Sequence, residues 1–335
     1  VFIFFWVSVR DGFCQSVSSE IITETLKAEE YVEKMMYFYE INRDSCMFYT
    51  KMAAKEYQKL NHWEKVPNLI NNIAVLLFDK GEYKEFQIYQ DSSYKIAKTY
   101  LDKTDVVFLN TLSLACAAQV IKGDYNKAIK IGLEAKNFEG EIFDMKSAAC
   151  DQLSNVYTMV GEYEKAIQTS MYSLSLRKDT LDEKRWTLAT SYNPLAYAYL
   201  KSGQLKKAAI NYNKAAFYNK LNFDDNISRN EYYSGLIKLV EVYTNDQRWK
   251  EANKLITELN EVIDDLKGIR LADYKSVLAY YMIALKDTDD DYIINLLNEA
   301  NELYYINLTN SFSDEKIARN LNYLSKVYAD SGDFD

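Results

Sequence analysis

Proline, glycine, histidine and cysteine are all scarce in this chain of 335 residues. Two prolines and ten glycines are too few turn-forming residues for a β-sandwich or β-barrel made of many short strands. The single histidine, His62, excludes a His-rich metal site and confines histidine acid–base chemistry to one position. Four cysteines without a C-x-x-C pair predict buried apolar side chains instead of a disulfide framework; they are Cys14, Cys46, Cys116 and Cys150.

Positive charge is also in short supply. Forty Lys and Arg residues against 49 Asp and Glu residues give a formal net charge of −9, the wrong sign for a protein held to nucleic acid by phosphate contacts. Hydrophobic residues nevertheless make up 48% of the chain, so it folds around a core. We therefore expect a mostly helical protein with no nucleic-acid partner, built as two ordinary domains or as one extended array.

Long apolar runs are absent except at the start, where Val1 to Val9 form a run of nine residues. Nine residues are too few to cross a bilayer, for which a helix of about 20 is needed. The run matches the apolar centre of a secretory signal peptide, although no A-x-A cleavage site follows it. We interpret residues 1–17 as the remnant of a leader, which predicts export to the cell envelope or periplasm. The alternative is a fortuitously apolar N-terminus on a cytoplasmic protein. No membrane span is expected in this segment.

A short phrase built around glycine recurs along the chain. Glycine is followed by an acidic or amide residue and then by an aromatic or large apolar residue, as in Gly161-Glu-Tyr163-Glu-Lys-Ala166. The gaps between the first four copies are 42, 38 and 42 residues, and the 129 residues before the last copy equal about three further periods. Weaker copies stand at the expected places, Gln247-Arg-Trp249 and Asp290-Asp-Tyr292. The turn glycines are Gly81, Gly123, Gly161, Gly203 and Gly332.

Each of these glycines lies between two helical patterns. Before the turn, a Leu, a small residue and a Tyr share one helical face, as in Leu153, Ser154 and Tyr157. After the turn, Ala or Ser recurs at helical spacing. Glycine ends the first helix because it adopts the left-handed conformation at little cost, so the repeating unit is a hairpin of a helix A and a helix B. Most tyrosines fall on core positions of this pattern, among them Tyr157, Tyr199 and Tyr243.

These phrases resemble the tetratricopeptide repeat, in which Trp-x2-Leu-Gly-x2-Tyr and Ala-x3-Phe recur about every 34 residues. The longer period of about 42 residues is similar to the repeats of kinesin light chains and their bacterial relatives. The resemblance implies an all-α fold, a right-handed α-solenoid of antiparallel helix pairs, over residues 61–335. We expect residues 18–60 to form capping helices and a degenerate repeat, and the array to break off in mid-repeat after Gly332.

The resemblance also implies that helix A lines a concave groove and that ligand contacts come from its groove-facing positions. One such position lies ten residues before the turn glycine, and a second lies four residues later. Because an Asn side chain both donates and accepts, it suits the backbone of an extended peptide. The alternative is that these polar groups only bond to the neighbouring helix A. The predicted groove residues are Asn71, Val75, Asp151, Asn155, Asn193, Tyr197, Glu241 and Asn322.

This pattern predicts an interaction surface and no reactive chemistry. We expect a non-catalytic scaffold that binds a protein or peptide in its groove, without a cofactor; a small-molecule ligand is not favoured. The alternative is the recognition arm of a larger signalling or protease protein, since similar repeats precede CHAT proteases, histidine kinases and helix-turn-helix regulators. An α/α-toroid hydrolase is disfavoured because its carboxylates would have to gather at one funnel. The acidic run from Asp287 to Asp291 is interpreted as a solvated turn, so no metal is expected.

Overall fold

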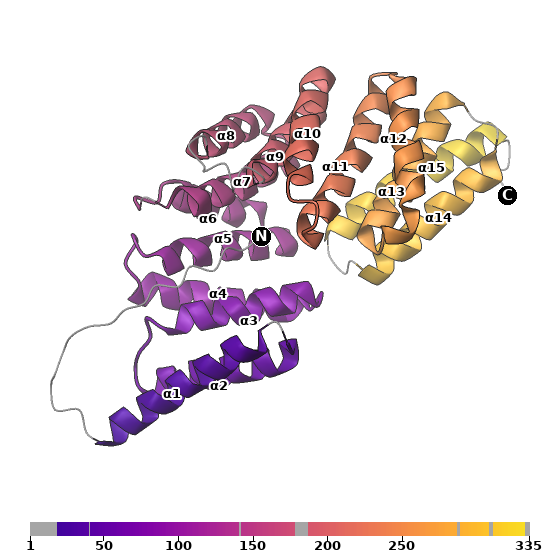
Figure 1. The fold of residues 1–335 in the computed structure, drawn as a ribbon. Coiled ribbons are helices and arrows are strands. Elements are labelled where there is room, and N and C mark those ends of the chain that lie inside the picture. Colours follow the sequence, from indigo (N-terminus) through magenta and orange to yellow (C-terminus); the bar gives the residue numbers. More distant parts are fainter. Residues whose placement is uncertain are drawn as a thin grey trace. The chain divides into compact units, whose positions relative to one another are not determined.

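In the computed structural model the described residues are 19–39, 41–140, 142–177, 187–286, 289–307 and 311–331. They form fifteen α-helices, a short 3-10 helix at Ile263–Asp265 and no β-strand, so the predicted all-α fold is confirmed. The expected leader, Cys14 and Gly332 lie outside this part of the chain. The helices (Figure 1) are α1 Ser19–Phe38, α2 Arg43–Lys59, α3 Val66–Asp79, α4 Tyr83–Tyr100, α5 Val106–Lys122, α6 Tyr125–Lys136, α7 Phe143–Met159, α8 Tyr163–Leu176, α9 Leu188–Lys201, α10 Leu205–Lys220, α11 Asn226–Asn245, α12 Trp249–Glu261, α13 Ile269–Leu285, α14 Asp290–Asn307 and α15 Ser311–Ser331.

Consecutive helices pack as hairpins. The pairs are α1 with α2, α3 with α4, α7 with α8, α9 with α10, α11 with α12, and α13 with α14. The first member of each pair is its helix A and the second its helix B; α15, which packs on α14, follows as a further helix A. Helix A of one hairpin also packs on helix A of another, as α7 does on α9, α11 on α13 and α13 on α15. The helical-hairpin solenoid that the repeat implies is therefore confirmed.

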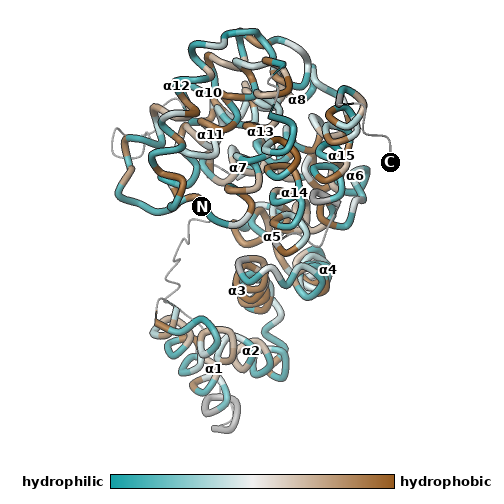
Figure 2. The backbone as a smooth tube through the Cα atoms, turned by 90° about the vertical axis from the view of Figure 1, so that its right-hand side faces the viewer, coloured by the Kyte–Doolittle hydropathy of each residue, from teal (hydrophilic) through white to brown (hydrophobic). Residues whose placement is uncertain are grey.

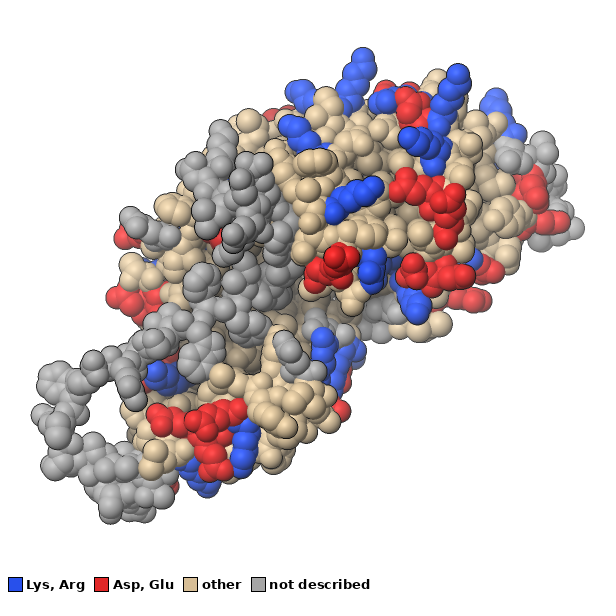
Figure 3. Space-filling view, viewed as in Figure 1, with Lys and Arg blue, Asp and Glu red and all other residues tan. Residues whose placement is uncertain are grey.

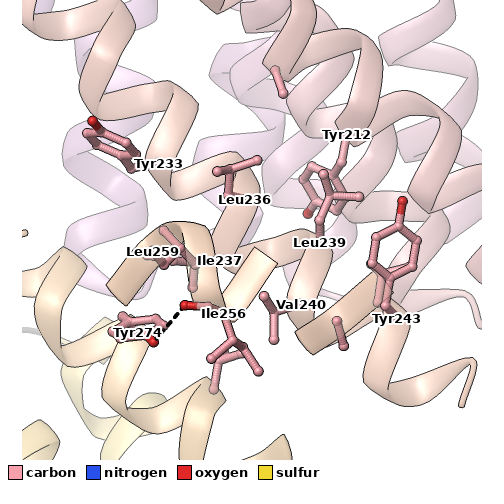
Figure 4. Close-up of a cluster of buried hydrophobic side chains, with 14 of the residues drawn as sticks. Tyr212, Tyr233, Leu236, Ile237, Leu239, Val240, Tyr243, Ile256, Leu259 and Tyr274 are labelled. Carbon is pink, nitrogen blue, oxygen red and sulfur yellow. Dashed lines mark hydrogen bonds between the residues drawn. The ribbon is translucent and has the colours of Figure 1, made fainter. Parts of the chain in front are cut away.

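The chain divides into two compact units, Val1–Ala115 and Cys116–Asp335, and the division falls inside α5. In the first unit, Leu69 and Leu76 of α3 pack with Ala53 of α2 and Met35 of α1. In the second unit, one buried cluster runs from α9 to α13, and Figure 4 shows its Tyr, Leu and Ile side chains interleaved between the helices. Each unit therefore buries a core of its own.

The turn glycines adopt the backbone conformation that the repeat predicts. Their φ angles lie between +76° and +81°, a region that residues with a Cβ enter only at a cost. At the third of these turns, the N–H of Glu162 donates to the carbonyl of Tyr157 at 2.8 Å, which closes helix A. The glycines in question are Gly81, Gly123, Gly161 and Gly203.

Two later turns have no glycine where the repeat requires one. Gln247 and Lys286 nevertheless have φ angles of +55° and +57°, and α12 and α14 begin two and four residues later. An Asp289 carboxylate oxygen accepts the N–H of Tyr292 at 3.1 Å and so caps α14. The weaker copy at Gln247 is therefore a hairpin turn. The copy at Asp290-Asp-Tyr292 lies in the first turn of α14, four residues after the turn at Lys286, and the acidic run includes a helix cap. Asp287 lies outside the described residues.

Small side chains let neighbouring helices approach closely. Ser154 of α7 donates to the carbonyl of Ala166 of α8 at 2.9 Å. A Cβ added to Gly132 of α6 would lie only 2.9 Å from the Leu153 side chain of α7. Hydrophobic and hydrophilic stretches alternate along the helices (Figure 2), as one-sided burial requires. The predicted core role of three tyrosines is confirmed, because Tyr157 and Tyr243 are buried and Tyr199 packs half-buried against the core.

The cysteines of the described residues are buried. Cys46, Cys116 and Cys150 are free thiols with almost no exposed surface. Burial raises the pKa of Cys116 and of Cys150 to about 12, which removes thiolate chemistry at neutral pH. The prediction that these side chains are apolar fillers is confirmed.

Candidate partner-binding surface

Asn71, the predicted groove residue of α3, is bonded inside the first unit. Its side chain is 1% exposed, and its Nδ2 donates to Thr111 Oγ1 of α5 at 2.9 Å. Ser93 Oγ of α4 donates to Asn71 Oδ1 at 2.8 Å. These bonds fit the alternative in which the amide joins neighbouring helices. Val75, one turn later on the same helix, is half-buried.

Asp151 of α7 is likewise buried, and it lies next to an arginine. Arg177 Nη1, at the end of α8, lies 2.7 Å from Asp151 Oδ2, and Ser191 Oγ of α9 donates to the same oxygen at 2.9 Å. Burial raises the pKa of Asp151 by more than the Arg177 guanidinium lowers it. The carboxylate therefore ties three helices together. Asn155, one turn further along α7, is exposed.

Side chains from several A helices of the second unit meet on one face. Arg319 of α15 lies 3.8 Å from the carboxylate of Glu241 on α11, although α13 is the A helix between them. Tyr197 of α9 lies within electrostatic range of Glu315 and Arg319 of α15. Side chains from hairpins two or three apart converge only on the inner side of a curved stack. This face is therefore the concave face of the second unit.

Further polar contacts on this face join α13 to α14 and α15. The Asp273 carboxylate accepts from Lys316 Nζ and from the hydroxyl of Tyr304, both at 2.6 Å. Ser276 Oγ donates to Asn320 Oδ1 at 2.6 Å. On α11, Lys238 Nζ lies 3.2 Å from the Glu241 carboxylate. We use the name concave network for six residues, Tyr197, Lys238, Glu241, Asp273, Lys316 and Arg319.

The charges of the concave network hold one another ionised. Burial by itself would raise the pKa of Glu241 and of Asp273, but the neighbouring cations lower each pKa by more. Glu241 in turn raises the pKa of Lys238. Burial lowers the pKa of Lys316 by more than the Asp273 carboxylate raises it. All six side chains keep part of their surface exposed, so a partner can compete for their contacts.

Two polar groups on this face have unused hydrogen-bonding capacity. Arg319 Nη2 lies 3.3 Å from Ser276 Oγ, and its Nε is buried without a hydrogen-bond partner. Asn193 Oδ1, one turn before Tyr197 on α9, is also buried without a partner in the described structure. A buried polar atom left unpaired costs free energy, about 1–3 kcal/mol. The Nε and Oδ1 atoms themselves are shielded from solvent, but both side chains keep other surface exposed on this face.

An aromatic pair adjoins the network. The rings of Tyr280 on α13 and Tyr323 on α15 stack with centroids 5.2 Å apart, and the Tyr280 hydroxyl donates to Asn245 Oδ1 at 2.5 Å. Burial raises the pKa of Tyr197 and of Tyr323 to about 12, so both stay neutral donors. Asn322, next to this pair in the chain, is exposed. The face thus combines charge, amide and aromatic surface.

The structure brings together only some of the predicted groove residues. Asn193, Tyr197 and Glu241 lie in or beside the concave network, whereas Asn71 and Asp151 are bonded within the helix stack. The groove role of all eight predicted residues stays a prediction.

Four charged members of the network are not among the residues predicted from the sequence: Lys238, Asp273, Lys316 and Arg319. The predicted groove positions lie at fixed offsets before a turn residue that these four do not share, and the turn after α13 has Lys286 in place of glycine. Asp273 lies thirteen residues before Lys286, and Arg319 lies thirteen before Gly332. That shared offset was the available signal.

We also searched the described residues for a reactive histidine, a metal site and a membrane span. His62 is half-exposed, and its Nδ1 lies 3.2 Å from a Glu64 carboxylate oxygen. No group of three or more His, Cys, Asp or Glu residues there could hold a metal ion. None of the described helices combines the length and the apolar character that a bilayer crossing requires. On the face shown in Figure 3, acidic and basic side chains are intermixed.

Comparison with known proteins gives a match of fold alone. No family model matches the chain, and neither does any curated protein. A tetratricopeptide repeat protein from Parabacteroides merdae ATCC 43184 is 14% identical, with a TM-score of 0.58, over 88% of this chain and 99% of that one. The apo form of RapI is 16% identical, with a TM-score of 0.60, over 88% and 99%. A Rap protein complexed with competence and sporulation factor is 11% identical, with a TM-score of 0.55, over 93% and 99%.

These structures and the hairpins described above agree on one architecture. The glycine phrases, the φ angles at the turns and the paired helices all follow the tetratricopeptide pattern. The likeness to the solved structures extends over most of the chain. The protein has the fold of the tetratricopeptide-repeat solenoids.

Proposed function

We propose that this protein is a non-catalytic scaffold that binds a partner protein or peptide on the concave face of its second unit. The main observation behind this proposal is that Tyr197, Glu241 and Arg319 converge from A helices that belong to different hairpins. Partly exposed polar groups that converge from several elements form a surface suited to recognition. One of the similar structures is a Rap protein complexed with competence and sporulation factor, which supports a binding role for this fold.

The chemistry of the face favours an extended polypeptide segment. Arg319 offers guanidinium donors to a carbonyl or a carboxylate, and the partly exposed Asn193 offers its side-chain amide to the peptide main chain. The stacked Tyr280 and Tyr323 rings offer apolar contact with some polar character. Main-chain groups of an extended peptide present donors and acceptors in alternation, which this mixture can satisfy.

The test begins with ligands selected on the protein itself. Peptides are selected from a random dodecapeptide phage library on the wild-type protein, and their affinities are measured by fluorescence anisotropy. The variant Asn193→Ala/Arg319→Gln should weaken binding of the selected peptides by about tenfold or more, because it removes an amide and a guanidinium from the face. Its far-UV circular dichroism spectrum should match that of the wild type.

The matched control also removes one amide and one positive charge, but on the outer face. Asn253→Ala/Lys254→Gln alters two exposed residues of α12 and should leave peptide binding unchanged. The concave assignment is wrong if the two variants weaken binding equally, if neither does, or if no peptide is selected. Two wider expectations stay predictions, namely export and a role as recognition arm of a larger signalling or protease protein. Translation of the reading frame on both sides of this sequence tests them.

A further inference from the structure

Helix α10 has an outer face that combines lysines with large apolar side chains. Lys206, Ile210, Lys214, Phe217 and Leu221 follow one another at intervals of three or four residues, and all are exposed. The apolar members are 56%, 61% and 56% exposed. A helix of this length normally turns its polar residues outward. Exposed apolar side chains gathered on one face mark a contact surface.

The lysines of this face have no acidic partner. α10 contains four lysines and neither Asp nor Glu, which is the largest net positive charge of any helix in the described residues. Lys207 lies over the Tyr199 ring and Lys214 over the Tyr192 ring, at 5.3 and 5.2 Å. No salt bridge of the described structure involves any of the four. Their charge is directed at solvent in a protein that is acidic as a whole.

Helix α14 has an outer face of the opposite charge. It contains four carboxylates and no Lys or Arg. Asp291, Glu302, Tyr305 and Ile306 are exposed on it. Glu299 is paired with Lys275, whereas Asp291 and Glu302 take part in no salt bridge of the described structure.

The two faces match in length. Lys206 to Leu221 and Asp291 to Ile306 each cover about 22 Å of helix. When the helices are laid side by side in the same direction, Lys206 faces Asp291 and Leu221 faces Ile306. Phe217 then faces Glu302, and Lys214 and Lys220 lie three residues before and after Phe217. We infer that the outer face of α10 binds the outer face of α14 in a second copy of this chain.

The contact has to be made between molecules. In one copy α10 packs on α9 and α11, α14 packs on α13 and α15, and both outer faces point away from those partners. Because the two faces differ, each copy can bind one neighbour through α10 and another through α14, so the assembly is head-to-tail and open-ended. One helix against another buries little surface, which makes the association weak and dependent on salt.

Mass measured against concentration tests the inference on the full chain. In light scattering after size exclusion, the weight-average mass should rise above 39.0 kDa with protein concentration at about 0.05 M NaCl. It should return to 39.0 kDa at about 1 M NaCl, where the Debye length is about 3 Å. Lys206→Glu/Lys214→Glu and Asp291→Lys/Glu302→Lys should each abolish the rise. Mixing these two variants should restore it, because each then supplies the complement of the other.

Three more variants separate the inference from its competitors. Phe217→Ser/Ile306→Ser should weaken association by about tenfold, since apolar contact contributes alongside charge. Lys130→Glu/Lys326→Glu changes the net charge as much as the α10 reversal, at exposed lysines of other helices, and should have no effect. Asn193→Ala/Arg319→Gln should also have none, which keeps this contact distinct from the concave face. A constant mass of 39.0 kDa under all conditions, an equally damaging control, or a mixture that fails to associate would overturn the inference.

Discussion

Replacing Arg177 by Met would isolate the Asp151 carboxylate inside the second unit. The two side chains are 5% and 9% exposed, and Nη1 and Oδ2 lie 2.7 Å apart. Oδ1 of Asp151 already has no hydrogen-bond partner, and Ser191 is the donor that would remain on Oδ2. Met retains much of the apolar volume of the arginine stem, so the change removes charge with little loss of packing.

The expected cost follows from the burial of the pair. Removing one member of a buried ion pair costs about 3–5 kcal/mol, because the other charge is left unpaired away from water. Both groups are too deeply buried for the solvent screening that weakens surface pairs. The companion variant Asp151→Leu/Arg177→Met removes both charges and should recover most of that loss. Urea-induced unfolding followed by far-UV circular dichroism measures both values.

The loss should also depend on pH in a definite direction. Burial already raises the pKa of Asp151 above its usual value of 3.8, and removing Arg177 raises it further. Above a raised pKa the ionised carboxylate destabilises the folded state, and the penalty vanishes once the group is protonated in both states. The difference in unfolding free energy between wild type and Arg177→Met should therefore narrow as pH falls from 7 toward 4. A loss below about 1 kcal/mol at pH 7, or a difference that does not change with pH, would refute the reasoning.

Two other predictions concern the turns and the concave network. Gly161→Ala should lower the unfolding free energy by about 1 kcal/mol, and Gln247→Gly should raise it by a similar amount, because both positions have positive φ. No atom of the described residues crowds a Cβ added at Gly161, so the backbone conformation alone sets the cost. Thermal unfolding should move the two Tm values in opposite directions, and a shift of both in the same direction would contradict this. Burial opposes the ionisation of Asp273, but Lys316 and Lys238 hold its pKa below 3.8. The ionised Asp273 therefore stabilises the folded state above pH 3.8, and this stabilisation is lost as the pH falls through the lowered pKa. Asp273→Asn should therefore be less stable than wild type at pH 7 and show a flatter stability profile below about pH 4, whereas parallel profiles would count against the assignment.

Much of the fold could be predicted from the sequence because local chemistry specifies it. The turn glycine, the small residue at the helix contact and the aromatic residue one helical turn later can all be identified in the sequence, and the structure gives these glycines the expected positive φ. The turn at Gln247 could also be placed, and the turn at Lys286 to within four residues, since both weaker copies of the repeat keep its period. The candidate site was harder to predict. Asn71 and Asn193 have equivalent positions in the repeat. The side chain of Asn71 is hydrogen-bonded to Thr111 and Ser93, whereas the side-chain oxygen of Asn193 has no hydrogen-bond partner among the described residues.

The sequence by itself determined the helical hairpin, its period and the register of its turns, because each depends on residues that are neighbours in the chain. Only the tertiary structure decided which polar side chains share a face. Glu241 and Arg319 are separated by almost two repeats, and they meet because small rotations between successive hairpins add up to a curve. As the second helices of their hairpins, α10 and α14 present outer faces of opposite charge. The rotation angle between two hairpins depends on the packing of many side chains, so it cannot be predicted from any single residue.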